Sequence, residues 1–272
     1  PSLQDRFETH SCCVVIPTYN NAQSLSAVID SVLEHTSNII IADDGSTDHT
    51  PGILEKYTDL EQVRLPKNKG KGYALRQAFR KARERGYRYA ISMDSDGQHF
   101  ASDLPAFLNA IEEYPGSLIV GARNMSDAGA PGKSNFGLRF SNFWYTVCTG
   151  IKLPDTQSGY RLYPLEKLQP MHFVTRRFEF EVEVIVRAAW RKVKVMPVPV
   201  KVYYPPAEER ISHFRPFTDF FRISVLNTVL VLLALLWFRP YLFLSELTRK
   251  KFKAIITREP YKPRETNAVK VA

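Results

Sequence analysis

The stretch YRYAISMDSDGQHF (residues 87–100) joins a short apolar run to two aspartates that are separated by one residue. A short apolar run of this kind is typical of a buried strand in a parallel sheet. Asp94 and Asp96 follow where this strand is expected to end. Asp and Gly are also common turn residues, so the segment alone does not distinguish a functional site from a polar turn. The surrounding sequence has to decide between the two interpretations.

Apolar runs and helical patterns alternate along the first half of the chain. This alternation predicts an α/β fold with a mostly parallel, Rossmann-like sheet flanked by helices. Asn20 and Asn21 are expected to cap the first helix. The expected strands are CCVVIPTY, NIIIADDG, QVRLP, YRYAISM and SLIVGA, and the expected helices cover residues 25–33, 51–57, 73–85 and 104–113.

The bulk composition indicates one sizeable folded domain with an appendage. The chain has 272 residues, of which 44% are hydrophobic and 24% charged, and these proportions exclude a disordered protein. A net charge of +9 favours anionic partners such as phosphorylated metabolites, anionic lipid surfaces or nucleic acid. The three cysteines form no disulfide framework, which favours a reducing compartment. The polar first ten residues show no signal peptide.

Charged side chains follow the ends of three expected strands. Asp43 and Asp44 end one strand, Asp94 and Asp96 follow another, and Arg123 follows a third. Open α/β sheets bind their ligands at the carboxyl ends of the strands. These residues are therefore expected to line one ligand-binding edge.

Two carboxylates one residue apart in a turn can both reach a single divalent cation, which prefers oxygen ligands and commonly bridges carboxylates to phosphates. Asp94 and Asp96 fit this role, with Gln98 as a third oxygen ligand. A calcium-binding EF-hand loop is excluded, because His99 and Pro105 stand where that loop requires Gly and Glu. The segment GKGYAL also lacks the spacing of a phosphate-binding P-loop.

The order and spacing of several motifs resemble a known family. VVIPTYNN, ADDGSTD, NKGKGYALRQAF, MDSDGQH and GAR resemble the inverting nucleotide-sugar glycosyltransferases of the family 2 type, which have a GT-A fold. Further along, GLRFSN, DTQSGYRLY and FEFEVEVIVRAA resemble the polyprenol-phosphate branch, the dolichyl-phosphate mannose synthase type. The resemblance covers roughly the first four-fifths of the chain.

This resemblance implies a role for individual residues. It implies a divalent cation, Mg²⁺ or Mn²⁺, held by Asp94, Asp96 and Gln98. The donor-binding residues that it implies are Pro17, Tyr19, Asp43, Asp44, Lys71, Asp94 and Asp96. The acceptor-binding residues are Arg123, Arg139, Ser158, Arg161, Arg210 and His213, and the catalytic residues are Asp94, Asp96, Arg123, Arg139 and Asp155.

Two positions depart from the pattern of the branch. Asn21 stands where the branch often has Glu, which weakens a ribose contact there. The late basic segment ERISHFRP lacks the glycine that usually separates its basic residues, so it is open which of them meets a phosphate.

The predicted activity is inverting transfer of a hexose, mannose or glucose, from a GDP- or UDP-sugar to a polyprenyl phosphate. Such a phosphate is already largely ionised at neutral pH, so it needs positive residues for placement more than a base. One alternative is transfer to a hydroxyl of a lipid or saccharide, which requires a general base, with Asp155 as the candidate. Another is a non-catalytic protein that binds anionic membranes or nucleic acid. The acidic pairs disfavour it, since they would repel a polyanion.

Residues 223–238 are nearly all apolar and lie between Arg222 and Arg239. This length is marginal for a hydrocarbon core of ~30 Å, which needs about 20 residues. A strongly basic segment follows, and if the helix crossed the bilayer it would lie outside, against the positive-inside tendency. We expect a helix that lies on the cytoplasmic membrane face, with the catalytic domain in the cytoplasm; a buried helix of a soluble domain is the alternative. The expected domains are a catalytic domain (1–215), a membrane-associated helical segment (216–248) and a basic tail (249–272).

Overall fold

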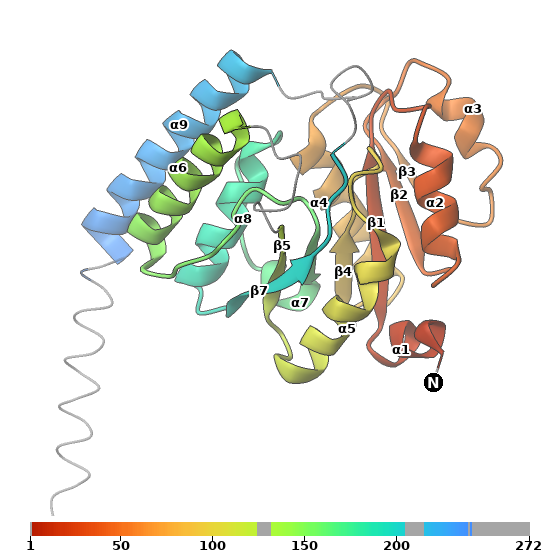
Figure 1. The fold of residues 1–272 in the computed structure, drawn as a ribbon, viewed down its shortest axis with the longest axis horizontal. Coiled ribbons are helices and arrows are strands. Elements are labelled where there is room, and N and C mark those ends of the chain that lie inside the picture. The colour runs from red at the N-terminus through yellow and green to blue at the C-terminus, as the bar shows by residue number, and fades with distance from the viewer. Residues whose placement is uncertain (1, 124–131, 205–214, 239, 241–272) are drawn as a thin grey trace, which may run out of the picture. The chain divides into compact units, whose positions relative to one another are not determined.

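A computed structural model of the chain describes residues 2–123, 132–204, 215–238 and 240. By its internal contacts the chain divides into two compact units, Pro1–Val231 and Leu232–Ala272. The first unit contains the sheet and most of the helices (Figure 1).

The sheet of the first unit has seven strands in the order β3-β2-β1-β4-β6-β5-β7. Every neighbouring pair is parallel except the two pairs that involve β6, which runs antiparallel to β4 and β5. The expectation of a mostly parallel sheet is confirmed. The strands are β1 (Cys12–Thr18), β2 (Ile39–Asp43), β3 (Glu61–Arg64), β4 (Tyr89–Ser92), β5 (Leu118–Arg123), β6 (Arg161–Pro164) and β7 (Val195–Val200).

Helices flank this sheet and connect its strands (Figure 1). The four expected helices correspond to α2, α3, α4 and α5, which confirms the helical periodicity. The α-helices are α1 (Leu3–Thr9), α2 (Leu25–Leu33), α3 (Thr50–Leu54), α4 (Lys71–Glu84), α5 (Leu104–Glu113), α6 (Gly132–Thr149), α7 (Leu165–Leu168), α8 (Glu179–Trp190) and α9 (Pro216–Leu233). A 3₁₀ turn, η1 (Ala101–Asp103), precedes α5, and a π-helical turn, η2 (Ala234–Phe238), follows α9.

The expected capping of α2 by Asn20 and Asn21 is wrong. The residue that precedes the helix is Ser24, and its side chain makes no capping hydrogen bond. Asn20 instead has φ 45°, a left-handed conformation that Asn tolerates better than most residues. The side chain of Asn21 is directed to the loop after β4, as described below.

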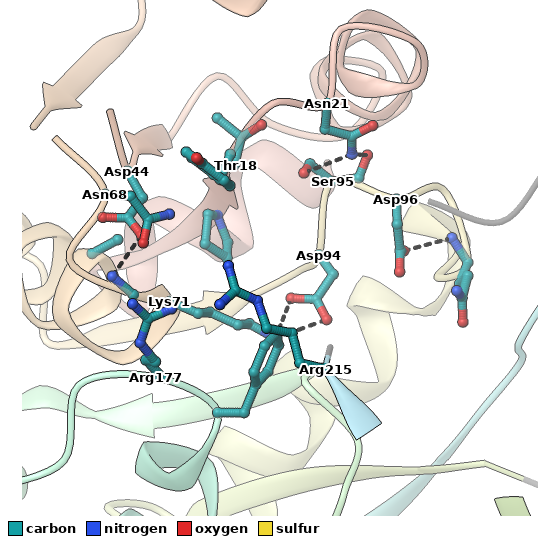
Figure 2. A pocket seen from close by; sticks show the side chains of 16 residues that line it. Thr18, Asn21, Asp44, Asn68, Lys71, Asp94, Ser95, Asp96, Arg177 and Arg215 are labelled. Atoms are coloured by element: carbon teal, nitrogen blue, oxygen red, sulfur yellow. Dashed lines mark hydrogen bonds and ion pairs between the residues drawn. The ribbon is translucent and has the colours of Figure 1, made fainter. Parts of the chain in front are cut away.

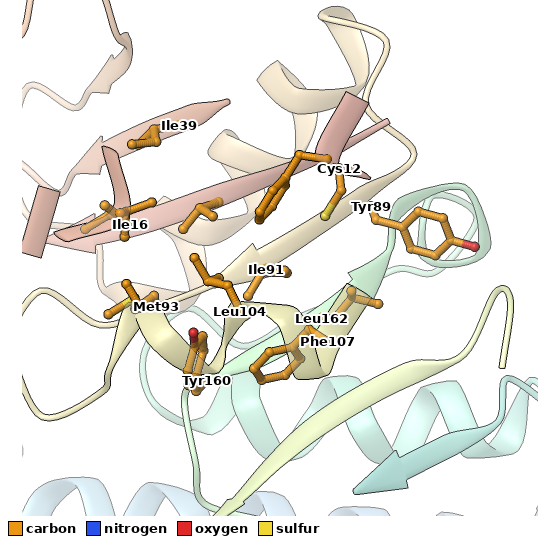
Figure 3. Packing of buried hydrophobic residues seen from close by; sticks show 14 of the residues in the cluster. Cys12, Ile16, Ile39, Tyr89, Ile91, Met93, Leu104, Phe107, Tyr160 and Leu162 are labelled. Atoms are coloured by element: carbon orange, nitrogen blue, oxygen red, sulfur yellow. The ribbon is translucent and has the colours of Figure 1, made fainter. Parts of the chain in front are cut away.

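One hydrophobic core cluster is formed by the sheet together with the helices α1, α2, α3 and α5. All seven residues of β1 are buried, as expected for a strand inside a parallel sheet. Figure 3 shows Ile16 and Ile91 from β1 and β4 packed together with Phe107 of α5 and Tyr160. This packing fixes the strands whose carboxyl ends form the site.

Strands β1, β2 and β4 end at the same edge of the sheet. Thr18 at the end of β1 pairs with Asp43 at the end of β2, and Val15 pairs with Ser92 at the end of β4. The chain after β2 and after β4 therefore emerges on either side of the end of β1. Asp44 and Asp94, which are 50 positions apart in sequence, reach one pocket in this way.

An apolar helix extends over Phe217–Phe238, with 22 residues and a mean hydropathy of 2.0. It is the one helix of the described residues that is long and apolar enough to cross a membrane. Only 17% of an apolar stretch of 18 residues within it is buried. At 1.5 Å per residue, this length corresponds to roughly 33 Å, close to the ~30 Å of a hydrocarbon core. The helix is longer than the 223–238 stretch expected from the sequence, because it also includes the aromatic residues Phe217, Phe220 and Phe221.

Candidate active site

A pocket of about 640 Å³ opens at the carboxyl edge of β1, β2 and β4 (Figure 2). Seven of the residues expected in the site line it: Pro17, Tyr19, Asp44, Lys71, Asp94, Asp96 and Gln98. The other lining residues are Thr18, Asn21, Asn68, Gly70, Ala74, Ser95, Arg177, Phe178 and Arg215.

Asp44 holds the loop before α4 against the pocket. Its two carboxylate oxygens accept hydrogen bonds from the backbone N–H groups of Lys69 and Gly70, both at 2.7 Å. Burial raises the pKa of Asp44, although these two hydrogen bonds act in the opposite direction. Asp43 does not line the pocket; its carboxylate accepts a hydrogen bond from the backbone of Ser46.

Gly70 immediately precedes α4 and has φ 101°, a conformation that favours glycine. A side chain there would also meet Arg177, since a Cβ would lie 2.5 Å from its Cγ. The glycine therefore lets the loop before α4 lie directly against the segment that carries Arg177.

The ammonium group of Lys71 lies between the carboxylates of Asp94 and Glu181 at the floor of the pocket. Its ammonium donates a hydrogen bond to Asp94 Oδ2 at 2.9 Å and lies 2.7 Å from both Asp94 Oδ1 and Glu181 Oε1. The side chains of Lys71, Asp94 and Glu181 are 15%, 23% and 10% exposed. Burial alone would lower the pKa of Lys71, but the two carboxylates outweigh it and raise the pKa above its ordinary value. Lys71 is therefore protonated.

Gly159 packs against this ion pair. A Cβ at Gly159 would lie 2.5 Å from Asp94 Oδ2 and 2.8 Å from Lys71 Nζ. The glycine of the DTQSGYRLY motif is therefore needed for the close approach of the backbone to the two charged groups.

Asp96 lies beside this pair, and the negative charge of its carboxylate is less compensated by nearby cations than that of Asp94. It accepts a hydrogen bond from the backbone N–H of Gln98 at 3.0 Å. Burial, together with the charge of Asp94, raises the pKa of Asp96 to about 6. Among the described residues, Asp94 Oδ1 receives no hydrogen bond, although Lys71 is close to it.

These two neighbouring carboxylates fit a divalent cation, because their negative charges repel each other and a cation beside them would relieve this repulsion. In the described part of the chain, no group of three or more His, Cys, Asp or Glu side chains gathers around one point. A cation here would need further ligands from Gln98, water or phosphate oxygens, which is the usual arrangement for Mg²⁺.

Asn21 fixes the residue between the two aspartates. Its amide nitrogen donates to the backbone oxygen of Ser95 at 2.7 Å and to Ser95 Oγ at 3.0 Å (Figure 2). Its amide oxygen accepts a hydrogen bond from Ser24 Oγ at 2.9 Å. This residue, at which the chain departs from the polyprenol-phosphate branch, thus stabilises the conformation of the Asp94–Asp96 turn.

Arg123 and Asp155 form a second charged group. Arg123 Nε lies 2.6 Å from Asp155 Oδ2, and a second guanidinium nitrogen lies 3.1 Å from Asp155 Oδ1. Asp155 also accepts hydrogen bonds from the backbone N–H groups of Gln157 and Ser158. Burial would raise the pKa of Asp155, but Arg123 and these donors lower it. A carboxylate held in this way is a weak proton acceptor.

The other acceptor-side residues are more scattered. Arg161 is fully buried, and its guanidinium donates to the backbone oxygens of Ser158, Thr156 and Glu181, so it is not at the pocket surface. Ser158 is also buried. Arg139 is exposed on α6 and does not line the pocket. Arg210 and His213 lie outside the described residues.

Of the two pocket arginines, Arg177 was missed from the sequence, whereas Arg215 belongs to the basic segment ERISHFRP, in which the residue that meets a phosphate was left open. Arg177 precedes α8, and Arg215 precedes α9. Neither guanidinium is ion-paired with a carboxylate of the described ranges, so both can attract an anion. The TRRF segment that contains Arg177 carries no spacing that separates this residue from an ordinary surface arginine.

Solved structures show which class this fold belongs to. The structure of glucosyl-3-phosphoglycerate synthase from Mycobacterium tuberculosis with Mn²⁺, UDP and phosphoglyceric acid matches with a TM-score of 0.63 and 19% identity, over 85% of this chain and 81% of the other. The same enzyme with Mg²⁺ and UDP matches with a TM-score of 0.58 and 19% identity, over 85% and 82%. The fold is that of the GT-A glycosyltransferases.

The sequence defines the family. Residues 13–169 match the domain described as Glycosyl transferase family 2, and the chain therefore belongs to this family. UDP-N-acetylglucosamine–dolichyl-phosphate N-acetylglucosaminyltransferase of Methanococcus voltae is 28% identical over 70% of this chain and 85% of the relative. Polyprenol monophosphomannose synthase of Mycolicibacterium smegmatis is 26% identical over 71% and 77%. The dolichyl-phosphate beta-glucosyltransferase of Homo sapiens is 27% identical over 74% and 69%.

Proposed function

We propose that this chain transfers a hexose from a nucleoside diphosphate sugar to a polyprenyl phosphate, with inversion at the anomeric carbon and with a divalent cation. The observation that carries the proposal is the pair Asp94 and Asp96 at the edge of a pocket that also contains Arg177 and Arg215. Carboxylates for a cation and arginines for phosphates are the groups that a sugar diphosphate requires. Relatives named as dolichyl- and polyprenol-phosphate transferases support the acceptor class.

The donor half of the site comes from the loops after β1, β2 and β4. Pro17, Tyr19 and the loop held by Asp44 form the wall against which the nucleoside would lie. Asp96 and Gln98, with Asp94 beside them, would hold the cation, which neutralises the charge that grows on the leaving diphosphate. Arg177 and Arg215 contribute to the same stabilisation from the opposite wall.

The acceptor half needs positive charge rather than a base. A phosphate monoester is already largely ionised at neutral pH, so it can attack the anomeric carbon without losing a proton to the protein. Asp155 accordingly serves to hold Arg123, with two nitrogen–oxygen contacts of 2.6 and 3.1 Å, rather than to accept a proton. Arg139, Arg210 and His213 remain candidates for contacts with the acceptor phosphate.

We further propose that the apolar helix Phe217–Phe238 associates the protein with a membrane, with the catalytic domain in the cytoplasm. A polyprenyl phosphate resides in a bilayer, and Arg215 connects the pocket directly to the start of this helix. The same proposal divides the chain into a catalytic domain (1–215), a membrane-associated helical segment (216–248) and a basic tail (249–272).

The test is a transfer assay with the purified full chain, Mg²⁺ or Mn²⁺, and a panel of UDP- and GDP-sugars, with and without a short-chain polyprenyl phosphate. We expect one donor to be consumed only when the lipid phosphate is present. EDTA and the Asp96→Ala substitution should abolish the reaction, and the exposed Asp59→Ala should not. The anomeric configuration of the product, read by NMR, tests inversion. Turnover with a glycolipid or diacylglycerol instead would keep the enzyme class and refute the acceptor.

A further inference from the structure

The helix α8 begins with EFEVEV (residues 179–184), and its three glutamates are buried although they have no role in the site expected from the sequence. Glu183 is bound by Thr175 and Arg187, away from the ion pair of the pocket floor. Glu181 is different, because its carboxylate lies 2.7 Å from the ammonium of Lys71, which also contacts Asp94. Glu181 is therefore linked through a single lysine to Asp94, the first of the two aspartates of the pocket.

Glu181 lies between two buried cations. Its side chain meets Lys71, and its backbone oxygen accepts a hydrogen bond from the fully buried guanidinium of Arg161. Arg161 donates only to backbone oxygens in the described structure, so its charge has no carboxylate partner in direct contact. It is close enough to influence the ionisation of Asp94.

The balance of charge at the pocket floor depends on Glu181. Three carboxylates, those of Asp94, Asp96 and Glu181, oppose the two cations Lys71 and Arg161. Loss of the charge of Glu181 would make the surroundings of Asp94 and Asp96 more positive by one unit charge, which weakens their attraction for a cation.

We propose that Glu181 is a positioning residue that holds Lys71 and offsets its charge, so that Asp94 and Asp96 keep their affinity for a divalent cation. This inference rests on the cation site proposed above. It adds a residue 85 positions beyond Asp96, on helix α8, that does not line the pocket.

Three variants separate an effect of charge from an effect of structure. Glu181→Gln removes the charge but keeps an oxygen that can accept from Lys71. Lys71→Met removes the cation, and the double variant removes both. We expect Glu181→Gln to weaken Mn²⁺ binding and Lys71→Met to strengthen it, each by about tenfold or more, as for one unit charge a few ångströms away. The double variant should lie within about threefold of the wild type, because the net charge is restored.

The measurement is the free Mn²⁺ signal in electron paramagnetic resonance, titrated with the full chain and the metal alone, without donor. Glu183→Gln is the matched control, since it is the same substitution on the same helix at a glutamate that Arg187 neutralises. Circular dichroism checks that each variant is folded, and Lys71→Gln replaces Lys71→Met if the latter is not.

Opposite shifts that cancel in the double variant support the inference, since a loss of structure would weaken binding in all three. If the wild type binds Mn²⁺ and Asp96→Asn does not, but the three variants bind like the wild type, the role of Glu181 is refuted and the proposed function stands. If the wild type itself binds no Mn²⁺, the cation site and the inference both fail.

Discussion

The guanidinium of Arg123 and the carboxylate of Asp155 are joined by two nitrogen–oxygen contacts of 2.6 and 3.1 Å, and Asp155 is fully buried. Arg123 is the last residue of β5, and Asp155 begins the turn that leads to β6. The pair therefore connects the end of β5 to the turn that leads into its antiparallel neighbour, β6. Its buried position makes it a stability element, and we propose that it also belongs to the acceptor side of the site.

Asp155→Asn should lower the free energy of unfolding by about 3 kcal/mol, as when one partner of a buried ion pair is removed. Because the pKa of Asp155 is lowered below its ordinary value of 3.8, the pair stabilises the protein above this pH. This contribution is lost as the pH falls through the lowered value. Urea denaturation of both proteins at about pH 7 and about pH 3 should show the difference between them shrinking at the lower pH.

The same variant tests the chemistry. With a polyprenyl phosphate as acceptor, kcat should fall only mildly, because no proton has to be accepted. A loss of about 10²–10⁴-fold in folded protein would be that expected for a general base, and would favour a hydroxyl acceptor.

Gly159→Ala should disturb the site more than the fold. The added methyl group would meet the ends of the Asp94 and Lys71 side chains at 2.5 and 2.8 Å, so these charged groups must move. We expect a fall of about tenfold or more in kcat/KM, which corresponds to about 1.4 kcal/mol of lost transition-state stabilisation. Gly52→Ala is the control, since nothing lies within 4 Å of a Cβ there. Equal activity of both variants would show that the Lys71–Asp94 contact does not matter for turnover.

Asn21→Asp should weaken donor binding. The carboxylate that replaces the amide cannot donate to the backbone oxygen of Ser95, and it would add a third negative charge beside Asp94 and Asp96. We expect a higher KM for the donor and a loss of about 1–3 kcal/mol in stability. Asn20→Asp, the same change one residue earlier, keeps the oxygen that accepts from Thr47 and should be nearly neutral. A normal KM in the Asn21 variant would remove Asn21 from the donor site.

The apolar helix Phe217–Phe238 should keep the protein on membranes in high salt. At about 1 M salt, electrostatic attraction extends only about 3 Å, so a protein held by charge alone is released. We expect the full chain to remain in the membrane fraction after such a wash and to be extracted by detergent. Quantitative release by salt would mean that the helix is not inserted.

The strands with regular apolar runs were predictable, and so was the edge at which their acidic residues meet. β6 and β7 were not. β7 has the sequence VMPVPV, and two prolines argue against a strand; the structure accommodates them because β7 is at the edge of the sheet. β6 has only four residues, and its buried Arg161 interrupts the apolar pattern.

The contacts between side chains of the site were harder to predict from the sequence than the positions of its residues in the chain. Glu181 alternates with apolar residues, which suits one face of a strand as well as a helix turn, and its lysine partner is 110 positions away. Arg161 lies in a motif of the acceptor side, but its side chain is buried among backbone oxygens. Distance in sequence and the direction of a side chain are properties of the packed fold, and no local pattern reports them.

The neighbours of Lys71 come from three distant parts of the chain: Asp94 after β4, Gly159 before β6, and Glu181 on α8. During synthesis, the first five strands emerge well before the ribosome reaches residue 181. Contacts between such distant positions form late, because their loop-closure entropy must be overcome first. The buried charges of the pocket floor therefore assemble only after residue 181 has been made, and until then a nascent chain has a sheet edge but not a complete binding site.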